Sequence, residues 1–69
     1  ISDKYNISPR EREVLDLIMK GKANKEIEDE LFISLRTVKA HVSNIYKKFG
    51  VQNRLELINF IQKKRPQNK

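Results

Sequence analysis

The sequence predicts an all-α fold, a compact domain of four helices with a central helix-turn-helix. Apolar residues recur at intervals of three and four in four segments, which is the spacing of one face of an α-helix. A helix-capping residue precedes each segment, and glycine or proline follows three of them. The chain has 69 residues and no cysteine, so packed helices must stabilise it without disulfides.

The first helix is expected over about residues 9–20. Ser8 is a typical N-cap, Pro9 suits the first helical position, and Glu11 stands at the third, which completes a capping box. Gly21 is a typical residue just beyond a helix end. The apolar face of this helix consists of Val14, Leu15, Ile18 and Met19.

The second helix is expected over about residues 25–31, with Asn24 as its N-cap. Ile27 and Leu31 lie four residues apart and face the core, while the remaining surface is acidic. Its body should therefore turn away from a polyanion, whereas its N-terminus, with Asn24 and Lys25, can face a phosphate. Clustered carboxylates sometimes mark a metal or acid–base site, but these surround a short helix without a nearby histidine and are better interpreted as a solvated surface.

The third helix follows a short turn and is expected over about residues 35–49, with Ser34 as N-cap and Gly50 as its end. Its apolar stripe consists of Val38, Val42, Ile45 and Phe49. The opposite face has Ala40 and Ser43 at its centre, and the basic residues around them are Arg36, Lys39 and Lys47. The DNA major groove, about 12 Å wide, admits a helix only if the side chains at closest approach are small. We therefore interpret this face as a DNA-reading surface.

The fourth helix is expected over about residues 54–65, with Asn53 as N-cap and Glu56 at the third helical position. Its end is set by Pro66. The apolar band is wider than one stripe and consists of Leu55, Leu57, Ile58, Phe60 and Ile61. Either the surplus binds a partner helix, or a domain this small uses the whole band internally.

The domain is thus expected over residues 7–65, with the helix-turn-helix motif at about 24–43. Residues 1–6 would form an N-terminal arm or linker, and residues 66–69 a basic tail. The chain does not begin with methionine, which is expected of a segment of a larger protein or of a processed one.

The charge of the chain favours a polyanionic partner. Fifteen Lys and Arg against nine Asp and Glu give a formal net charge of +6 and a pI near 9.8, which is typical of nucleic-acid binding. No apolar run is long enough to span a membrane, no signal-peptide pattern opens the chain, and the lack of cysteine fits a reducing compartment. We therefore expect a cytoplasmic protein with no membrane partner.

The stretch from Ser8 to Arg54 also resembles a known family. Its segments SPREREVL, NKEI, ISLRTVKAH and NIYKKFGV fall in the order and spacing of the LuxR/FixJ helix-turn-helix domains, also called NarL or GerE-like. The resemblance extends from Ile7 to Ile61. It implies a four-helix domain of a bacterial transcriptional regulator that binds double-stranded DNA, as found at the C-terminus of two-component response regulators. A receiver or sensor domain and RNA polymerase are the further partners that it implies.

The resemblance also assigns roles to individual residues. In the family, the residues that tend to meet base edges match Arg36, Lys39, Ala40 and Ser43. Those that tend to hold phosphates match Asn24, Lys25, Ser34, Thr37 and Lys47. The fourth helix commonly pairs two domains as a homodimer on a two-fold DNA site, and the corresponding candidates here are Leu55, Ile58, Ile61 and Gln62.

Two residues depart from the family's pattern, since Glu28 and Leu57 stand where alanine is usual. A glutamate at position 28 must splay outward, or the two helices of the motif must cross less closely. Leu57 enlarges the apolar band of the fourth helix. His41, the one histidine, lies at the edge of an apolar stripe and is interpreted as a boundary residue, because it lacks partners for metal binding or catalysis.

Two other functions are compatible with the sequence. One is a helical protein-interaction module that docks a partner through the fourth helix or the basic face. The other is a sigma-factor promoter-recognition domain, although the short link at residues 21–23 favours the LuxR type. The sequence contains no recognisable nucleophile–base pair, phosphate loop or metal cluster, so we expect neither enzyme activity nor a cofactor.

Overall fold

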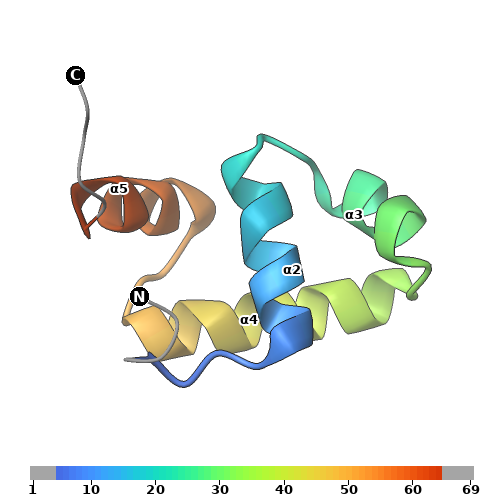
Figure 1. Ribbon diagram of the computed structural model, residues 1–69, viewed down its shortest axis with the longest axis horizontal. Helices are drawn as coiled ribbons and strands as arrows, with labels where there is room; N and C mark the ends of the chain where they lie inside the picture. Colours follow the sequence, from blue (N-terminus) through green and yellow to red (C-terminus); the bar gives the residue numbers. More distant parts are fainter. Residues whose placement is uncertain (1–4, 65–69) are drawn as a thin grey trace.

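The computed structural model describes residues 5–64. In this part of the chain four helices follow one another without a strand: α2 (Pro9–Met19), α3 (Asn24–Leu31), α4 (Leu35–Phe49) and α5 (Arg54–Lys64). α2 and α3 pack on α4, and α5 contacts both α2 and α4 (Figure 1). The all-α fold class is confirmed, while the expected tail at residues 66–69 lies outside the described residues.

One apolar cluster, with contributions from all four helices, forms the core. Its buried members are Val14, Leu15, Leu17, Ile18, Ile27, Val38, Val42, Ile45, Phe49, Leu57 and Ile61. The stripe expected on α4 is buried throughout. On α2 the buried face is wider than expected, since it includes Leu17 and leaves Met19 only partly covered. The reason is that α2 lies against both α4 and α5 and is covered from two sides.

Three aromatic rings join the start of the described chain to the end of α4 and to α5. The ring centroid of Tyr5 lies 4.5 Å from that of Phe49 and 5.8 Å from that of Phe60, and the two phenylalanine rings are 5.5 Å apart. These separations are those of favourable aromatic pairs. Tyr5, which the sequence placed in an arm or linker, therefore packs against the helical domain.

Most helix ends follow the sequence signals, and both exceptions are at the ends of α3. The capping box of Ser8 and Glu11 is present, and Gly21 and Gly50 adopt positive φ angles of 87° and 71° just after α2 and α4, where glycine carries no steric penalty. The turn between α3 and α4 uses Phe32 instead, at φ 56°. The ring of Phe32 is 92% exposed, so burial of the ring does not offset the strain of that backbone conformation.

Asn24 is not the N-cap of α3, which corrects the expectation from the sequence. The N-cap is Ala23, and the Glu26 carboxylate accepts its backbone N–H at 2.8 Å. The Asn24 side chain points elsewhere because its Oδ1 accepts a hydrogen bond from Arg54 of α5 at 3.0 Å. Asn24 is therefore the first helical residue, and its side chain links α3 to α5.

A partly buried ion pair joins the first turn of α2 to the last turn of α4. Glu11 is 5% exposed, and its Oε1 accepts hydrogen bonds from Lys48 Nζ at 2.6 Å and from the Ser8 backbone N–H at 3.1 Å. Lys48 Nζ also donates to the Asn6 carbonyl at 2.9 Å. Burial raises the pKa of the Glu11 carboxyl, but the hydrogen bonds from Lys48 and Ser8 and the charge of Lys48 outweigh it, so this pKa lies below its ordinary value.

We predict that Glu11→Gln lowers the free energy of unfolding at neutral pH by about 1–3 kcal/mol, because Lys48 then lacks a charged partner. Since the folded-state pKa of Glu11 is depressed, its contribution is present above the unfolded-state pKa and is lost as the pH falls through the folded-state pKa. Chemical denaturation of both proteins between neutral and acidic pH should show the gap between them closing in that acidic range.

The control for this experiment is Glu13→Gln, which removes an exposed carboxylate paired with Arg10 on the same helix. That change should cost at most about 0.5 kcal/mol. Equal losses in the two variants would show that the Glu11–Lys48 pair does not hold α2 against α4.

Candidate nucleic-acid interface

The outer face of α4 presents the residues that the sequence assigned to base recognition. Because Val38, Val42 and Ile45 face the core, the opposite side of the helix is left in solvent. The exposed residues on that side include Arg36, Lys39, Ala40, Ser43, Asn44 and Lys47. Short side chains at its centre permit close approach of a flat or grooved surface, and the long basic ones offer donors for phosphate oxygens and for guanine O6 and N7.

The N-terminus of α4 is capped as expected. Ser34 Oγ accepts the backbone N–H of Thr37 at 3.1 Å and lies 3.0 Å from the Thr37 hydroxyl oxygen. Ser34 is exposed and Thr37 partly exposed. Two hydroxyl groups therefore stand at the positive end of the helix dipole, where anionic groups are stabilised.

Arg54 fixes the N-terminus of α3, a role that was not predicted from the sequence. Its Nη1 donates to Asn24 Oδ1 at 3.0 Å and its Nη2 to the Lys22 carbonyl at 2.7 Å. Since the oxygen of the Asn24 amide is occupied, its NH₂ group remains as a donor for a phosphate. A signal was present in the sequence, because an arginine in the first turn of a helix is unfavourable for the helix dipole and indicates a partner elsewhere.

Glu28 turns toward the N-terminus of α4 instead of separating the two helices. Its Oε2 accepts the backbone N–H of Leu35, the first residue of α4, at 3.1 Å. Its Oε1 lies 3.8 Å from Lys25 Nζ. Ile27 beside it stays fully buried, so α3 and α4 remain packed. The structure thus places a carboxylate among the residues expected to hold phosphates.

The residues expected to pair two copies do not all reach the surface of α5. Leu55 is 68% exposed, Gln62 is exposed and Ile58 is partly buried. Ile61 is 1% exposed, because α5 uses it with Leu57 to pack on α2 and α4. The assignment of Ile61 to a dimer surface is therefore corrected. Leu57 likewise fills the core and adds nothing to the exposed apolar surface.

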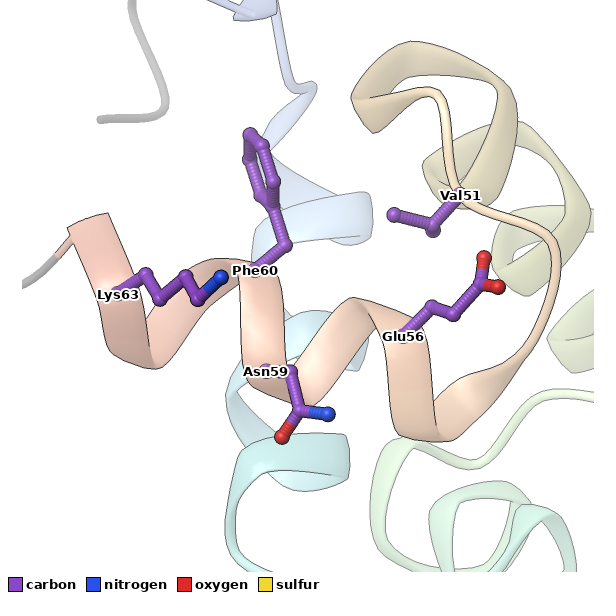
Figure 2. Close-up of a pocket in the computed structure, with 5 residues that line it drawn as sticks. All are labelled: Val51, Glu56, Asn59, Phe60 and Lys63. Carbon is purple, nitrogen blue, oxygen red and sulfur yellow. The ribbon is translucent and has the colours of Figure 1, made fainter.

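A shallow open pocket of about 290 Å³ lies along another part of α5 (Figure 2). Its lining residues are Val51, Glu56, Asn59, Phe60 and Lys63. Acidic, amide, basic and apolar groups each occur there, so its lining is mixed and none of the residues assigned to DNA contact belongs to it. Among residues 5–64 no group of three or more metal-ligating side chains comes together, and no helix in that range could cross a membrane.

His41 occupies the boundary position expected for it, partly exposed on α4. Its Nδ1 atom is buried and has no hydrogen-bond partner. A proton on Nδ1 would therefore be a buried donor without an acceptor.

Comparison with known proteins gives one consistent result. The model of a family described as bacterial regulatory proteins, luxR family, matches residues 5–61. Oxygen regulatory protein NreC of Staphylococcus aureus, from strains bovine RF122 / ET3-1 and MRSA252, is 46% identical over 65 residues, and the match covers 93% of this chain. NreC of strain JH9 matches to the same extent. The chain spans 30% of the length of these relatives.

We predict that Arg54→Met lowers the free energy of unfolding by about 1–2 kcal/mol, because two hydrogen bonds from a charged donor are lost. Asn24→Ala should add little to that loss in the double variant, since the two side chains share one interaction. Urea denaturation of the single and double variants measures the coupling. Lys63→Met, an exposed change on the same helix, serves as the control, and losses that simply add would contradict the link between α3 and α5.

Proposed function

The chain belongs to the luxR family of bacterial regulatory proteins, and from this premise we propose that it binds double-stranded DNA sequence-specifically as the effector domain of a transcriptional regulator, with α4 in the major groove. The observation that carries this proposal is the outer face of α4. It is small at its centre, basic around it, and free of core contacts.

In the proposed complex, α4 reads bases and the ends of α3 and α4 hold the backbone. The base-reading residues are Arg36, Lys39, Ala40 and Ser43. The phosphate-binding residues are Asn24, Lys25, Ser34, Thr37 and Lys47. Their environments support this division, because the first set shares the outer face of α4, whereas Asn24, Lys25 and Ser34 lie at helix N-termini, where backbone amides favour an anion.

We further propose that two copies pair on a two-fold DNA site through α5. The exposed side chain of Leu55 would lie at the centre of that contact, with Ile58 and Gln62 beside it. The net charge of +6 on each copy opposes pairing in solution until DNA neutralises it. The half-sites would then be about one helical turn, or roughly 10 bp, apart.

The relatives are about three times as long as the stretch that they share with this chain. We propose that the full-length protein carries a receiver or sensor domain and acts on RNA polymerase in the bacterial cytoplasm. Because these relatives are named oxygen regulatory proteins, we propose an oxygen-linked signal as the input of that other domain.

We predict that Ala40→Leu abolishes DNA binding without unfolding the domain. Ala40 is exposed on α4 and leucine is a good helix former, so stability should change by no more than about 0.5 kcal/mol. The added branch would stand between the helix and the floor of the groove. Thermal melting together with duplex titration tests both parts.

Gln52→Leu, which adds an apolar side chain at an exposed position between α4 and α5, is the control for Ala40→Leu and should leave groove contact intact. A folded Ala40→Leu domain with normal duplex affinity would show that this face does not enter the groove. Such a result would favour the protein-interaction module, which tolerates added apolar area.

We predict that Lys39→Ala and Lys25→Ala weaken binding in different ways. Lys39→Ala should relax preference at one base position and cost about 1–3 kcal/mol on the best site. Lys25→Ala should weaken all duplexes nearly equally, because a phosphate contact carries no base identity. Selection from random duplexes, repeated with each variant, measures the difference, and a changed preferred sequence for Lys25→Ala would refute its assignment to phosphate.

A further inference from the structure

We propose that Glu28 sets the affinity of the domain for DNA, because its carboxylate weakens phosphate contacts at the helix-turn-helix for every duplex, whatever its sequence. This inference rests on the proposed DNA-binding function. It concerns the negative charge of the Glu28 carboxylate, which none of the proposed DNA contacts requires.

The first observation is the position of the carboxylate. Glu28 Oε2 accepts the N–H of Leu35 at 3.1 Å, and this is the first amide of α4. The N-terminus of a helix attracts anions, because its amides are unpaired and the helix dipole is positive there. In this domain a side chain of the protein already supplies an anion at that place, so a DNA phosphate would have to compete with it.

The second observation is the partner of the other oxygen. Glu28 Oε1 lies 3.8 Å from Lys25 Nζ, and the Lys25 side chain is 77% exposed. The cation is therefore accessible to a phosphate, but part of its field is cancelled by the adjacent carboxylate. Each phosphate contact made by Lys25 must be formed against this neighbouring negative charge.

The third observation concerns the hydroxyl groups beside the same amide. Ser34 precedes Leu35 in sequence and is bonded to Thr37, and both hydroxyl residues are proposed phosphate ligands. A phosphate that reaches them approaches the α4 N-terminus, where Glu28 is bound. Because a phosphate contact carries no base identity, Glu28 lowers affinity for every duplex by a similar factor and leaves the preference for the best site unchanged.

The decisive variant is Glu28→Gln. Its side-chain amide oxygen can still accept the Leu35 N–H, so the capping bond remains while the charge is removed. Glu30→Gln is the matched control, because it removes one carboxylate from the same helix, where Glu30 pairs with Lys22 at 3.4 Å. Both variants raise the net charge by one. A difference between their affinities for DNA therefore reflects where the removed carboxylate lies, and not the total charge.

The experiment titrates each protein with a random-sequence duplex and with its best selected duplex over a range of salt. For Glu28→Gln we expect affinity for the random duplex to rise about three- to tenfold at roughly 0.1 M salt, and the log–log salt slope to steepen by about 0.9, as for one further neutralised phosphate. The ratio of best-site to random affinity should stay the same, because a phosphate contact carries no base identity. Glu30→Gln should change neither slope nor ratio measurably.

A second measurement keeps the test independent of any change in fold. Lys25→Gln is made in the natural chain and in Glu28→Gln, and its effect on random-duplex affinity is compared. We expect the loss to be at least twice as large in the Glu28→Gln background, because Lys25 is then no longer neutralised. Thermal melts of all variants verify that they are folded.

The outcomes separate the inference from the function on which it rests. If the natural chain binds neither duplex, the proposed function fails. If it binds, but Glu28→Gln matches Glu30→Gln in affinity and slope, or binds more weakly, then Glu28 only caps α4 and the inference is overturned. Equal effects of Lys25→Gln in the two backgrounds would overturn it as well.

Discussion

The ion pair between Glu11 and Lys48 is the constraint on which the rest of this domain depends. It connects residues 37 positions apart in sequence and fixes the end of α4 against the start of α2. The same carboxylate oxygen also accepts the Ser8 N–H that begins α2, so helix initiation and helix–helix packing use one group. With α3 packed near the other end of α4 (Figure 1), the direction in which the outer face of α4 points is fixed by its neighbours.

This arrangement places the basic and acidic groups in different parts of the domain. The outer face of α4 carries cations around short side chains, whereas several carboxylates are used internally, at caps and in ion pairs. Glu11, Glu26 and Glu56 each accept a backbone N–H near a helix start, where the helix dipole favours a negative charge. Negative charge is thereby concentrated at helix N-termini, and Glu28 is the case in which such a carboxylate lies close to the proposed phosphate ligands.

Local signals in the sequence predicted most of the fold, but they did not predict which residues far apart in sequence contact one another. The caps at Ser8 and Ser34 and the apolar stripe of α4 depend on residues within a few positions of one another, so periodicity and capping rules predict them. Asn24 was misassigned because Arg54, thirty residues away, binds its side chain. Ile61 was misassigned because a wide apolar band does not indicate which edge will meet the neighbouring helices. For Glu28, the sequence indicated an unusual residue, but only the structure shows that it binds the Leu35 amide.

The aromatic cluster of Tyr5, Phe49 and Phe60 has a consequence for how this molecule can be observed. The chain contains two tyrosines, three phenylalanines and no tryptophan, so the two tyrosines dominate its near-ultraviolet absorption and emission. Tyr5 is packed where three segments of the chain meet, and Tyr46 is partly buried on α4. Each reports on a different part of the domain without a label, which makes the natural chromophores a direct optical probe of whether both parts come apart in a single transition.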